Sequence, residues 1–445
     1  MVETGHDADR SASHREPLWQ AVRIWAQIGF LSFGGPTAQI ALMHRVIVDQ
    51  RKWLTEQQFL NALGFCMLLP GPEAMQLATF VGWRLHGITG GLIAGALFVL
   101  PGAAVVLMLS MIYAAFGNVP FVEALFFGIK AAVLVIVVDA LFKIAKRALK
   151  TREHWAIALL SFVGIFFFPL PFPAIILLAA IWGFVRLGSP VVPESSVRVV
   201  EEVVLGLRLI QSLKTIFVWL AIWLLPLVAI YSQWGPDHVL SKLGLFFSKL
   251  AVVTFGGAYA VLAYMAQDVV VYYQWLSAGQ MMDGLGLAET TPGPLILVTE
   301  FVGYMAAYQN GGEPAWLIGL AGAFVALWAT FMPCFLWIFA GAPYIEQINA
   351  QPRLRGAMSA ITAAVVGVIL NLSIWFGLHV FFGSVLQLDF GPMRLWVPMP
   401  ETLDWQVVGL AACSAYLLLY RNWGIASVLA VASALAVVLR FALIW

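Results

Sequence analysis

Two Pro-Gly-Pro triplets interrupt apolar runs of this chain that are otherwise long enough to cross a membrane. The first, Pro70-Gly71-Pro72, precedes Glu73, and the second, Pro292-Gly293-Pro294, follows Thr290-Thr291. Unpaired main-chain groups are costly inside a bilayer, so an interrupted helix is tolerated there only where protein buries it or where it lines a wet cavity. The duplicated break is therefore the feature that any fold of this chain must accommodate.

The composition places most of the chain in lipid. Hydrophobic residues make up 62% of its 445 residues and charged residues 11%, against roughly 25% charged in an average soluble domain. The first 18 residues are polar, lack the apolar core of a signal peptide and predict a disordered tail. The three cysteines lack metal-ligand spacing, so we expect no metal or other cofactor. No basic block indicates nucleic acid as a partner.

Windows of about 20 residues predict about thirteen membrane-spanning segments. They lie near residues 20–43, 57–82, 88–116, 121–142, 154–170, 171–187, 215–232, 242–266, 278–308, 314–342, 356–383, 404–420 and 424–443. Prolines at 169, 171 and 173 break the run 154–187, which predicts a tight helical hairpin there.

The chain repeats itself at an offset of 222 residues. Three signatures align: Phe33-Gly34-Gly35 with Phe255-Gly256-Gly257, Trp53-Leu54 with Trp275-Leu276, and the first Pro-Gly-Pro triplet with the second. From residue 33 to 72 the alignment needs no gap, and 15 of the 40 positions are identical. Farther on, Pro101 aligns with Pro333, and the run 128–139 aligns with 360–371. Such self-similarity indicates two copies of one structural unit.

The positions of the cations predict the orientation of the segments. A cluster after the fourth segment should be cytoplasmic and places the N-terminus there too: Lys143, Lys146, Arg147, Lys150 and Arg152. The loops near Gly117-Asn118 and Gln309-Asn310 carry no Lys or Arg and should lie outside. One loop disagrees, with His44, Arg45, Arg51 and Lys52. Either the first segment is partly re-entrant or these cations do not set the topology.

The order of segments predicts the fold class. Six segments in the first half and one connecting segment make the second copy enter from the opposite face, as in many secondary transporters. We expect an all-α polytopic membrane protein with two inverted-topology repeats and helices broken at the Pro-Gly-Pro motifs. The expected parts are a cytoplasmic tail 1–18, an N-terminal repeat 19–187, a cytoplasmic linker 188–214, a connecting segment 215–241 and a C-terminal repeat 242–445.

The two breaks predict a binding site for an anion. Proline suits a first helical turn because it has no N–H group to leave unpaired, so new helices should begin at Pro72 and Pro294. The N–H groups of each first turn then point toward the break with the positive end of the helix dipole, as in protein sites for phosphate. Inverted halves would bring these ends together around one doubly charged ligand. The alternative is that the motifs only kink and pack helices.

We expect both copies to contribute substrate-binding residues. In the first half these are Gly34, Gly35, Pro36, Thr37, Gln39, Pro70, Gly71, Pro72, Glu73, Gln76 and Lys130. In the second half they are Gly256, Gly257, Tyr259, Thr290, Thr291, Pro292, Gly293 and Pro294. Glycines let the main chain approach a ligand closely. Hydroxyl and amide groups can donate to oxyanion oxygens without a fixed charge that would prevent release.

Ionisable residues inside a predicted span are functional candidates. Lys130 lies within the fourth segment and could attract the dianion, or it could reach the interface instead. Glu73 could cap the new helix or carry a proton beside the substrate. Glu289 and Glu300 flank the second break, where either could take the place of Glu73. These three carboxylates are the candidates for proton coupling.

The residues around the breaks resemble the chromate ion transporter family in its long two-domain form. The resemblance rests on "FGGPTAQIALMHRVIVDQRKWL", on "LLPGPEAMQLATFVGWRLHGITGGLIAGALFVLPG" and on the second copy, "FGGAYAVLAYMAQ" with "TTPGPLILVTEFVGYMAA". It covers nearly the whole chain. The second copy has Ala258 and Leu295 where the first has Pro36 and Glu73, so the two half-sites cannot be chemically equivalent.

The resemblance implies a secondary carrier of the bacterial inner membrane that exports chromate, a tetrahedral dianion and sulfate analogue, from the cytoplasm. The residues alone predict an oxyanion carrier, driven by protons or the membrane potential. A sulfate uptake carrier is the main alternative, and an anion channel would use the same broken helices. A membrane enzyme would need a cluster of histidines or acids, and the seven histidines form none in the sequence. The expected partners are the dianion, protons and membrane lipid, with a homodimer left open.

Overall fold

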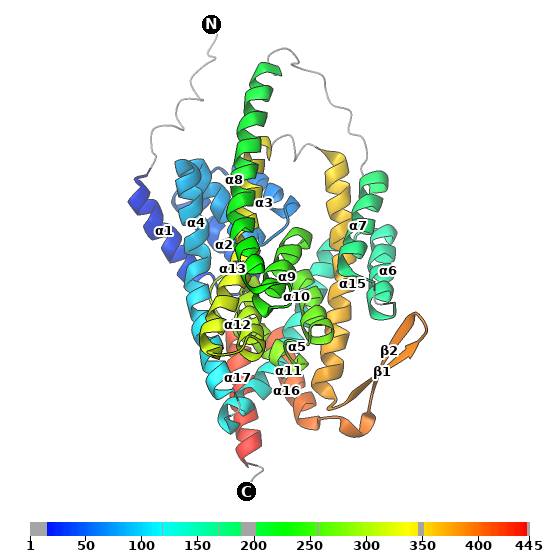
Figure 1. Ribbon diagram of the computed structural model, residues 1–445. Coiled ribbons are helices and arrows are strands. Elements are labelled where there is room, and N and C mark those ends of the chain that lie inside the picture. The colour runs from blue at the N-terminus through cyan, green and yellow to red at the C-terminus, as the bar shows by residue number, and fades with distance from the viewer. Residues whose placement is uncertain are drawn as a thin grey trace.

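Figure 1 shows the computed structural model, which describes residues 16–117, 119–168, 170–187, 202–255, 258–345 and 351–442. Only the main chain is described at residues 202–211, 260 and 442. Most of the predicted tail 1–18, the first part of the predicted linker 188–214, and the predicted site residues Gly256 and Gly257 lie outside the described residues.

The described residues of the first half form seven helices. They are α1 (Leu18–Leu31), α2 (Gly35–His44) with a π-helical turn at Arg45–Gln50, α3 (Glu56–Leu68), α4 (Glu73–Phe116), α5 (Pro120–Ala148), α6 (Arg152–Phe166), and α7 (Phe172–Trp182) with a π-helical turn at Gly183–Leu187. Helices α6 and α7 are the helical hairpin that the sequence predicts. The connecting helix α8 (Glu202–Trp234) begins inside the predicted linker.

The second half continues with helices of the same kind and one β-hairpin. They are α9 (Val239–Val253), α10 (Ala258–Gln267) with a π-helical turn at Asp268–Tyr272, α11 (Ala278–Thr290), a 3-10 turn at Leu295–Leu297, α12 (Val298–Asn310), α13 (Ala315–Gly341) and α15 (Pro352–Phe381). Strands β1 (Val385–Phe390) and β2 (Met393–Pro398) follow, and then α16 (Trp405–Ala415) and α17 (Ile425–Ala442).

Five of the described helices are long and apolar enough to cross a membrane. They lie at Glu73–Phe116, Pro120–Ala148, Ser212–Trp234, Ala315–Tyr344 and Pro352–Phe381. Four shorter apolar helical segments lie at Phe172–Leu187, Val261–Tyr272, Trp405–Tyr420 and Ile425–Phe441. These helices confirm the predicted class, a mainly helical membrane protein.

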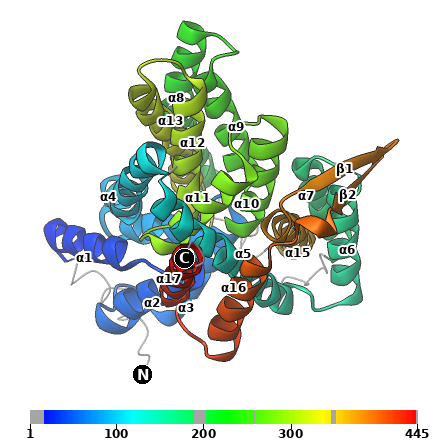
Figure 2. The same cartoon turned by 90° about the horizontal axis from the view of Figure 1, so that it is seen from below.

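The β-hairpin is an element that our sequence analysis did not predict. Its strands are antiparallel, with Asp389 opposite Arg394 in the register and an ion pair of 3.6 Å between these side chains. Gly391, at φ +62°, supplies the left-handed backbone of the turn. Viewed from below, the hairpin projects from the rim of the molecule (Figure 2).

The first two predicted spans fold back instead of crossing. Glu16, just before α1, forms an ion pair of 3.3 Å with Arg51, which follows α2. The Glu16 carbonyl oxygen also lies 2.9 Å from Nε2 of His86, where α4 kinks at His86-Gly87. The start of α1, the end of α2 and the kink of α4 therefore share one end of the molecule. The chain reverses within the predicted segments 20–43 and 57–82, so each returns to the end of the molecule where it starts, as the re-entrant alternative expects for the first.

Elements of the two halves correspond at the offset found in the sequence. Helices α3 and α11 have the same length, and each begins with a capping box, Thr55 with Gln58 and Ser277 with Gln280. Each of these helices is preceded by a π-helical turn and by one residue at φ 53°, Lys52 in one half and Gln274 in the other. Equivalent sequence signals thus produce equivalent local structure.

The two halves interlock. Helices α6 and α7 of the first half pack on α15 of the second, while α16 and α17 of the second half pack on α5 of the first (Figures 1 and 2). Glycines make these contacts close. A Cβ atom on Gly367 of α15 would overlap the Ala158 carbonyl oxygen of α6, and one on Gly128 of α5 would overlap that of Ala432 in α17. The predicted ranges 19–187 and 242–445 therefore are not separately packed bodies.

Candidate functional site

The two Pro-Gly-Pro breaks are joined to the opposite halves by a reciprocal pair of main-chain hydrogen bonds. The Gly71 N–H donates to the carbonyl oxygen of Thr254, at 2.9 Å, and the Gly293 N–H donates to that of Ser32, at 2.8 Å. Both the donors and the acceptors are equivalent at the offset of 222 residues. Each break therefore binds the end of the first helix of the other half.

Only glycine fits the central position of either break. Gly71 has φ +122° and Gly293 has φ +90°, both in the region that side chains with a Cβ rarely adopt. A Cβ atom on Gly71 would come within 2.9 Å of the Cys334 sulfur, and one on Gly293 within 3.4 Å of the Gly102 Cα. Left-handed backbone and close packing together explain the residue type.

Two glutamine side chains hold the breaks in place. Gln39 Nε2 donates to the carbonyl oxygens of Gly293, at 2.6 Å, and Ser32, at 3.3 Å. Gln76 Nε2 donates to the carbonyl oxygen of Pro70, at 2.7 Å. Both predicted site residues are buried, and their donors are engaged by main chain. The equivalent positions in the second copy are Val261 and Val298, so only the first copy supplies these amides.

Hydroxyl groups at the second break also bond locally. Thr290 and Thr291 donate to the carbonyl oxygens of Leu287, at 2.9 Å, and Ala288, at 3.2 Å. The Tyr259 hydroxyl donates to Oε1 of Glu289 at 2.8 Å, which joins two predicted site residues. This arrangement orients one carboxylate beside the second break.

The three candidate coupling carboxylates differ in their surroundings. Glu289 and Glu300 are buried, and Oε2 of Glu300 has no hydrogen-bond partner in the part of the chain that the structure describes. Glu73 is the first residue of α4 and lines a cavity. The second break is therefore enclosed, while the first meets open space.

The cavity at the first break measures about 310 Å³. Its wall combines the break, including Gly71 and Glu73, with Arg355, Ser359 and Thr362 of α15. Ser359 Oγ lies 3.1 Å from Nε2 of His154. The volume holds several water molecules at about 30 Å³ each. We missed the α15 residues as lining, although their spacing of four and three places them on one helical face.

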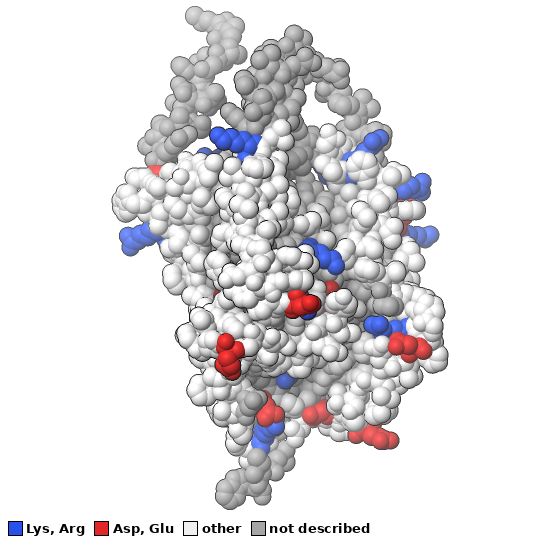
Figure 3. Space-filling view, in the orientation of Figure 1, with Lys and Arg blue, Asp and Glu red and all other residues white. Residues whose placement is uncertain are grey.

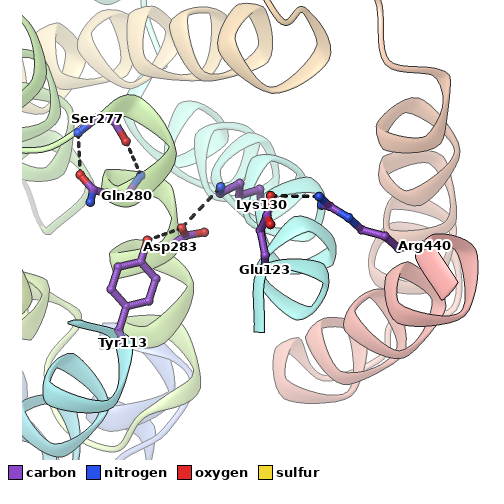
Figure 4. A network of polar contacts seen from close by, with 7 residues as sticks. All are labelled: Tyr113, Glu123, Lys130, Ser277, Gln280, Asp283 and Arg440. Carbon is purple, nitrogen blue, oxygen red and sulfur yellow. Dashed lines mark hydrogen bonds and ion pairs between the residues drawn. The ribbon is translucent and has the colours of Figure 1, made fainter. Parts of the chain in front are cut away.

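A second cavity, of about 260 Å³, contains Lys130. Lys130 Nζ lies 3.4 Å from Oδ2 of Asp283, which also accepts a hydrogen bond of 2.8 Å from the Tyr113 hydroxyl (Figure 4). Asp283 is only 3% exposed. The structure thus places Lys130 beside Asp283 at this cavity rather than in the lining of the cavity at the first break. Our sequence analysis missed Asp283 because its equivalent in the first copy is Asn61.

The other predicted site residues of the first half lie at the starts of α2 and α4. Gly34 and Gly35 have φ +84° and +76° and start α2, and Thr37 is exposed. Pro36 occupies the first turn of α2 and Pro72 precedes the first residue of α4, as expected for prolines that begin helices. Gly34 and Gly35 therefore follow Ser32, whose carbonyl oxygen accepts from the Gly293 N–H of the second break.

Comparison with known proteins gives the family. A family model described as chromate transporter matches residues 19–184 and 241–439. The chain is 30% identical to the chromate transport protein of Cupriavidus metallidurans over 79% of this chain and 80% of that protein. It is 28% identical to the probable chromate transport protein of Synechococcus elongatus, over 82% and 86%, and 30% identical to the chromate transport protein of Pseudomonas aeruginosa, over 77% of each. No solved structure matches. The chain belongs to the chromate transporter family.

Proposed function

We propose that this protein is a secondary carrier that exports chromate from the cytoplasm through a dianion site where the two broken helix ends meet. The observation that carries the proposal is the reciprocal hydrogen bonding of Gly71 and Gly293 to the opposite halves. A kink that served only one helix would not need a partner from the other half. Chromate is proposed as the substrate because two relatives are named chromate transport proteins.

The donors of the proposed site are main-chain N–H groups. The N–H groups of Gly71 and Gly293 are already engaged. The first turn of α4, at Glu73 and Ala74, and the turn at Leu295 and Ile296 supply groups that have no acceptor within their own helices. Each helix start carries roughly half a positive charge. Two such starts offset about one charge of a dianion, which leaves the remainder to a proton or a cation.

Protons are the proposed coupling ions, with Glu73, Glu289 and Glu300 as their carriers. Glu73 reaches the cavity, while Glu289 has an oriented hydroxyl partner in Tyr259. A carboxylate close to the dianion repels it when ionised and tolerates it when protonated. Such competition couples anion release to proton binding and supports an antiporter.

The proposed architecture is an inverted repeat in the inner membrane, with the N-terminus in the cytoplasm. In Figure 1, α15 descends to the β-hairpin, while its counterpart α5 starts at the lower end, beyond the end of α4. Basic side chains mark the upper end in Figure 3, and most of the visible acidic ones lie in the lower half. Cytoplasmic loops carry the excess of Lys and Arg, so this asymmetry supports a cytoplasmic upper end.

Uptake of sulfate is the second candidate function. The donors of the proposed site are N–H groups, which respond to the shape and charge of a ligand. Chromate and sulfate are both tetrahedral dianions, so such a site should hold both. The membrane potential then favours export, because moving one charge outward contributes about 2.3 kcal/mol per 100 mV.

Competition in inverted vesicles tests the proposal. Vesicles containing the protein should accumulate chromate in a saturable manner, and sulfate should compete while phosphate and molybdate are compared alongside. Counterflow of unlabelled chromate should accelerate uptake of labelled chromate, which a channel would not do. Accumulation of sulfate in right-side-out vesicles, without accumulation of chromate in inverted ones, would support the second candidate instead.

A further inference from the structure

The two cavities lie at equivalent helix interfaces but reach different depths. One is lined by α3 and α15 and includes Thr362. The other is lined by α5 and α11, together with the end of α15 and the start of α16, and includes Lys130, the counterpart of Thr362. The first cavity reaches Gly71 and Glu73 at the first break. The second is lined on α11 by Gly279 and Met282 alone, near the start of that helix. Among the described residues, we call the interface whose cavity reaches its break the open interface, and the other the closed interface.

At three positions the closed interface carries a charged cluster where the equivalent residues of the open interface are uncharged. It contains Lys130, Asp283 and Tyr113, joined by the ion pair of 3.4 Å and the hydrogen bond of 2.8 Å (Figure 4). The equivalent positions at the open interface are Thr362, Asn61 and Ile345, which carry no charge. A difference confined to one of two equivalent interfaces can bias which of them closes.

We propose that Lys130, Asp283 and Tyr113 form a gate on the face of the β-hairpin, and that the transported dianion opens it by replacing Asp283 as the partner of Lys130. The inference rests on the proposed function for the identity of the ligand. Tyr113 belongs to α4, Lys130 to α5 and Asp283 to α11, so the cluster ties three helices together. Lys130 is the member of the cluster that lines the cavity, where a dianion can approach it.

The geometry explains why a dianion can open the gate. Lys130 is 29% exposed and Asp283 4% by side chain, so the cation is reachable while its partner is covered. Oδ2 of Asp283 accepts from both Lys130 and Tyr113, so the carboxylate keeps the tyrosine donor when Lys130 turns to the ligand. Gly279, beside Lys130 Nζ, leaves room for that movement.

Cysteine accessibility tests the gate. Leu287 lies one turn beyond Asp283 on the same face of α11 and is buried, so a cysteine there reports opening. Leu287→Cys is introduced after Cys66, Cys334 and Cys413 are replaced by alanine, and a membrane-impermeant maleimide is added to right-side-out vesicles. The double variant Lys130→Thr with Asp283→Asn recreates the pair of the open interface. The cysteine at position 287 should react with the maleimide about ten-fold faster in this variant than in the parent, a factor within the usual range of coupling between two sites.

A matched control and a ligand arm complete the test. Neutralising Asp139 and Lys143, an ion pair farther along the same helix α5 with side chains 16% and 70% exposed, should leave labelling unchanged. Sulfate and chromate should accelerate labelling of the parent but not of Lys130→Gln. Unchanged labelling in the double variant, or acceleration by sulfate that persists in Lys130→Gln, would overturn the proposal. Labelling does not require transport, so the two proposals can fail separately. A parent protein that transports neither ion would refute the proposed function, and the labelling rate of the double variant would still test the gate.

Discussion

The N–H group of Gly71 donates a hydrogen bond of 2.9 Å to the carbonyl oxygen of Thr254, which lies in the other half of the chain. Its counterpart joins Gly293 to Ser32. These bonds lie at the turns of hairpins that α1, α3, α9 and α11 enter. The two bonds thus pair main-chain groups that would be costly to leave unpaired inside a bilayer. Each break is therefore stabilised by the end of the first helix of the other half.

Replacing Gly71 or Gly293 by alanine should abolish transport and lower stability. A Cβ atom at these positive φ values costs roughly 1–3 kcal/mol, and close neighbours at both positions add to it. Chromate uptake and thermal stability in detergent measure the two effects. Gly409→Ala, at an exposed helical glycine whose Cβ would meet nothing within 4 Å, should leave both unchanged or raise stability slightly. Equal behaviour of all three variants would contradict this account of the breaks.

Residues near Lys150 and Gln309 should label from opposite sides of the membrane. In the proposed topology, the end of α5 faces the cytoplasm and the end of α12 faces outside. Single cysteines at Lys150 and Gln309, treated with impermeant reagent in intact cells and in inverted vesicles, provide the measurement. A cysteine at position 309 that reacts only in inverted vesicles would lie on the cytoplasmic side, and the two repeats would then be parallel.

Lys130→Gln should lose transport and also stability, because it leaves the buried Asp283 carboxylate without its cation. Removing one partner of a buried pair costs about 3–5 kcal/mol. Adding Asp283→Asn should restore the thermal stability in detergent but not the uptake of chromate. If the double variant transported normally, Lys130 would have no role in the anion pathway.

The sequence predicts the breaks and the repeat well, since both depend on glycines and prolines whose backbone requirements are local. It leaves open whether the first segment folds back and does not predict this for the second, because an apolar run of suitable length looks the same whether it crosses or returns. The pair of Lys130 and Asp283 is also hidden, because α5 and α11 meet only through the interlocking of the two halves. Asp283 has no charged equivalent in the first copy, so a search for repeated features passes over it.

Glu289→Gln should separate anion exchange from proton coupling. The glutamine can still accept the hydrogen bond of 2.8 Å from Tyr259, so the second break keeps its shape, but it cannot exchange a proton. We expect chromate counterflow to persist and accumulation driven by a proton gradient to fall at least about ten-fold, the effect of 1.4 kcal/mol. Glu313→Gln, at an exposed residue before α13, serves as the control. Gradient-driven accumulation that survives in Glu289→Gln would remove this carboxylate from the coupling mechanism.

Replacing each Pro-Gly-Pro triplet by three alanines tests whether the breaks build the site. Alanine favours helix, so α3 should continue into α4, and the N–H groups of Glu73 and Ala74 should enter ordinary bonds within the helix. The same change at Pro292-Gly293-Pro294 should engage the N–H groups of Leu295 and Ile296. Both variants should lose chromate uptake, since each half supplies one helix end and neither alone offsets more than about half a charge.

The measurement is uptake into inverted vesicles, with folding checked by monodisperse elution in detergent. Well-folded variants that transport with normal affinity would reduce the motifs to kinks. Loss of uptake in only one variant would assign the site to a single break.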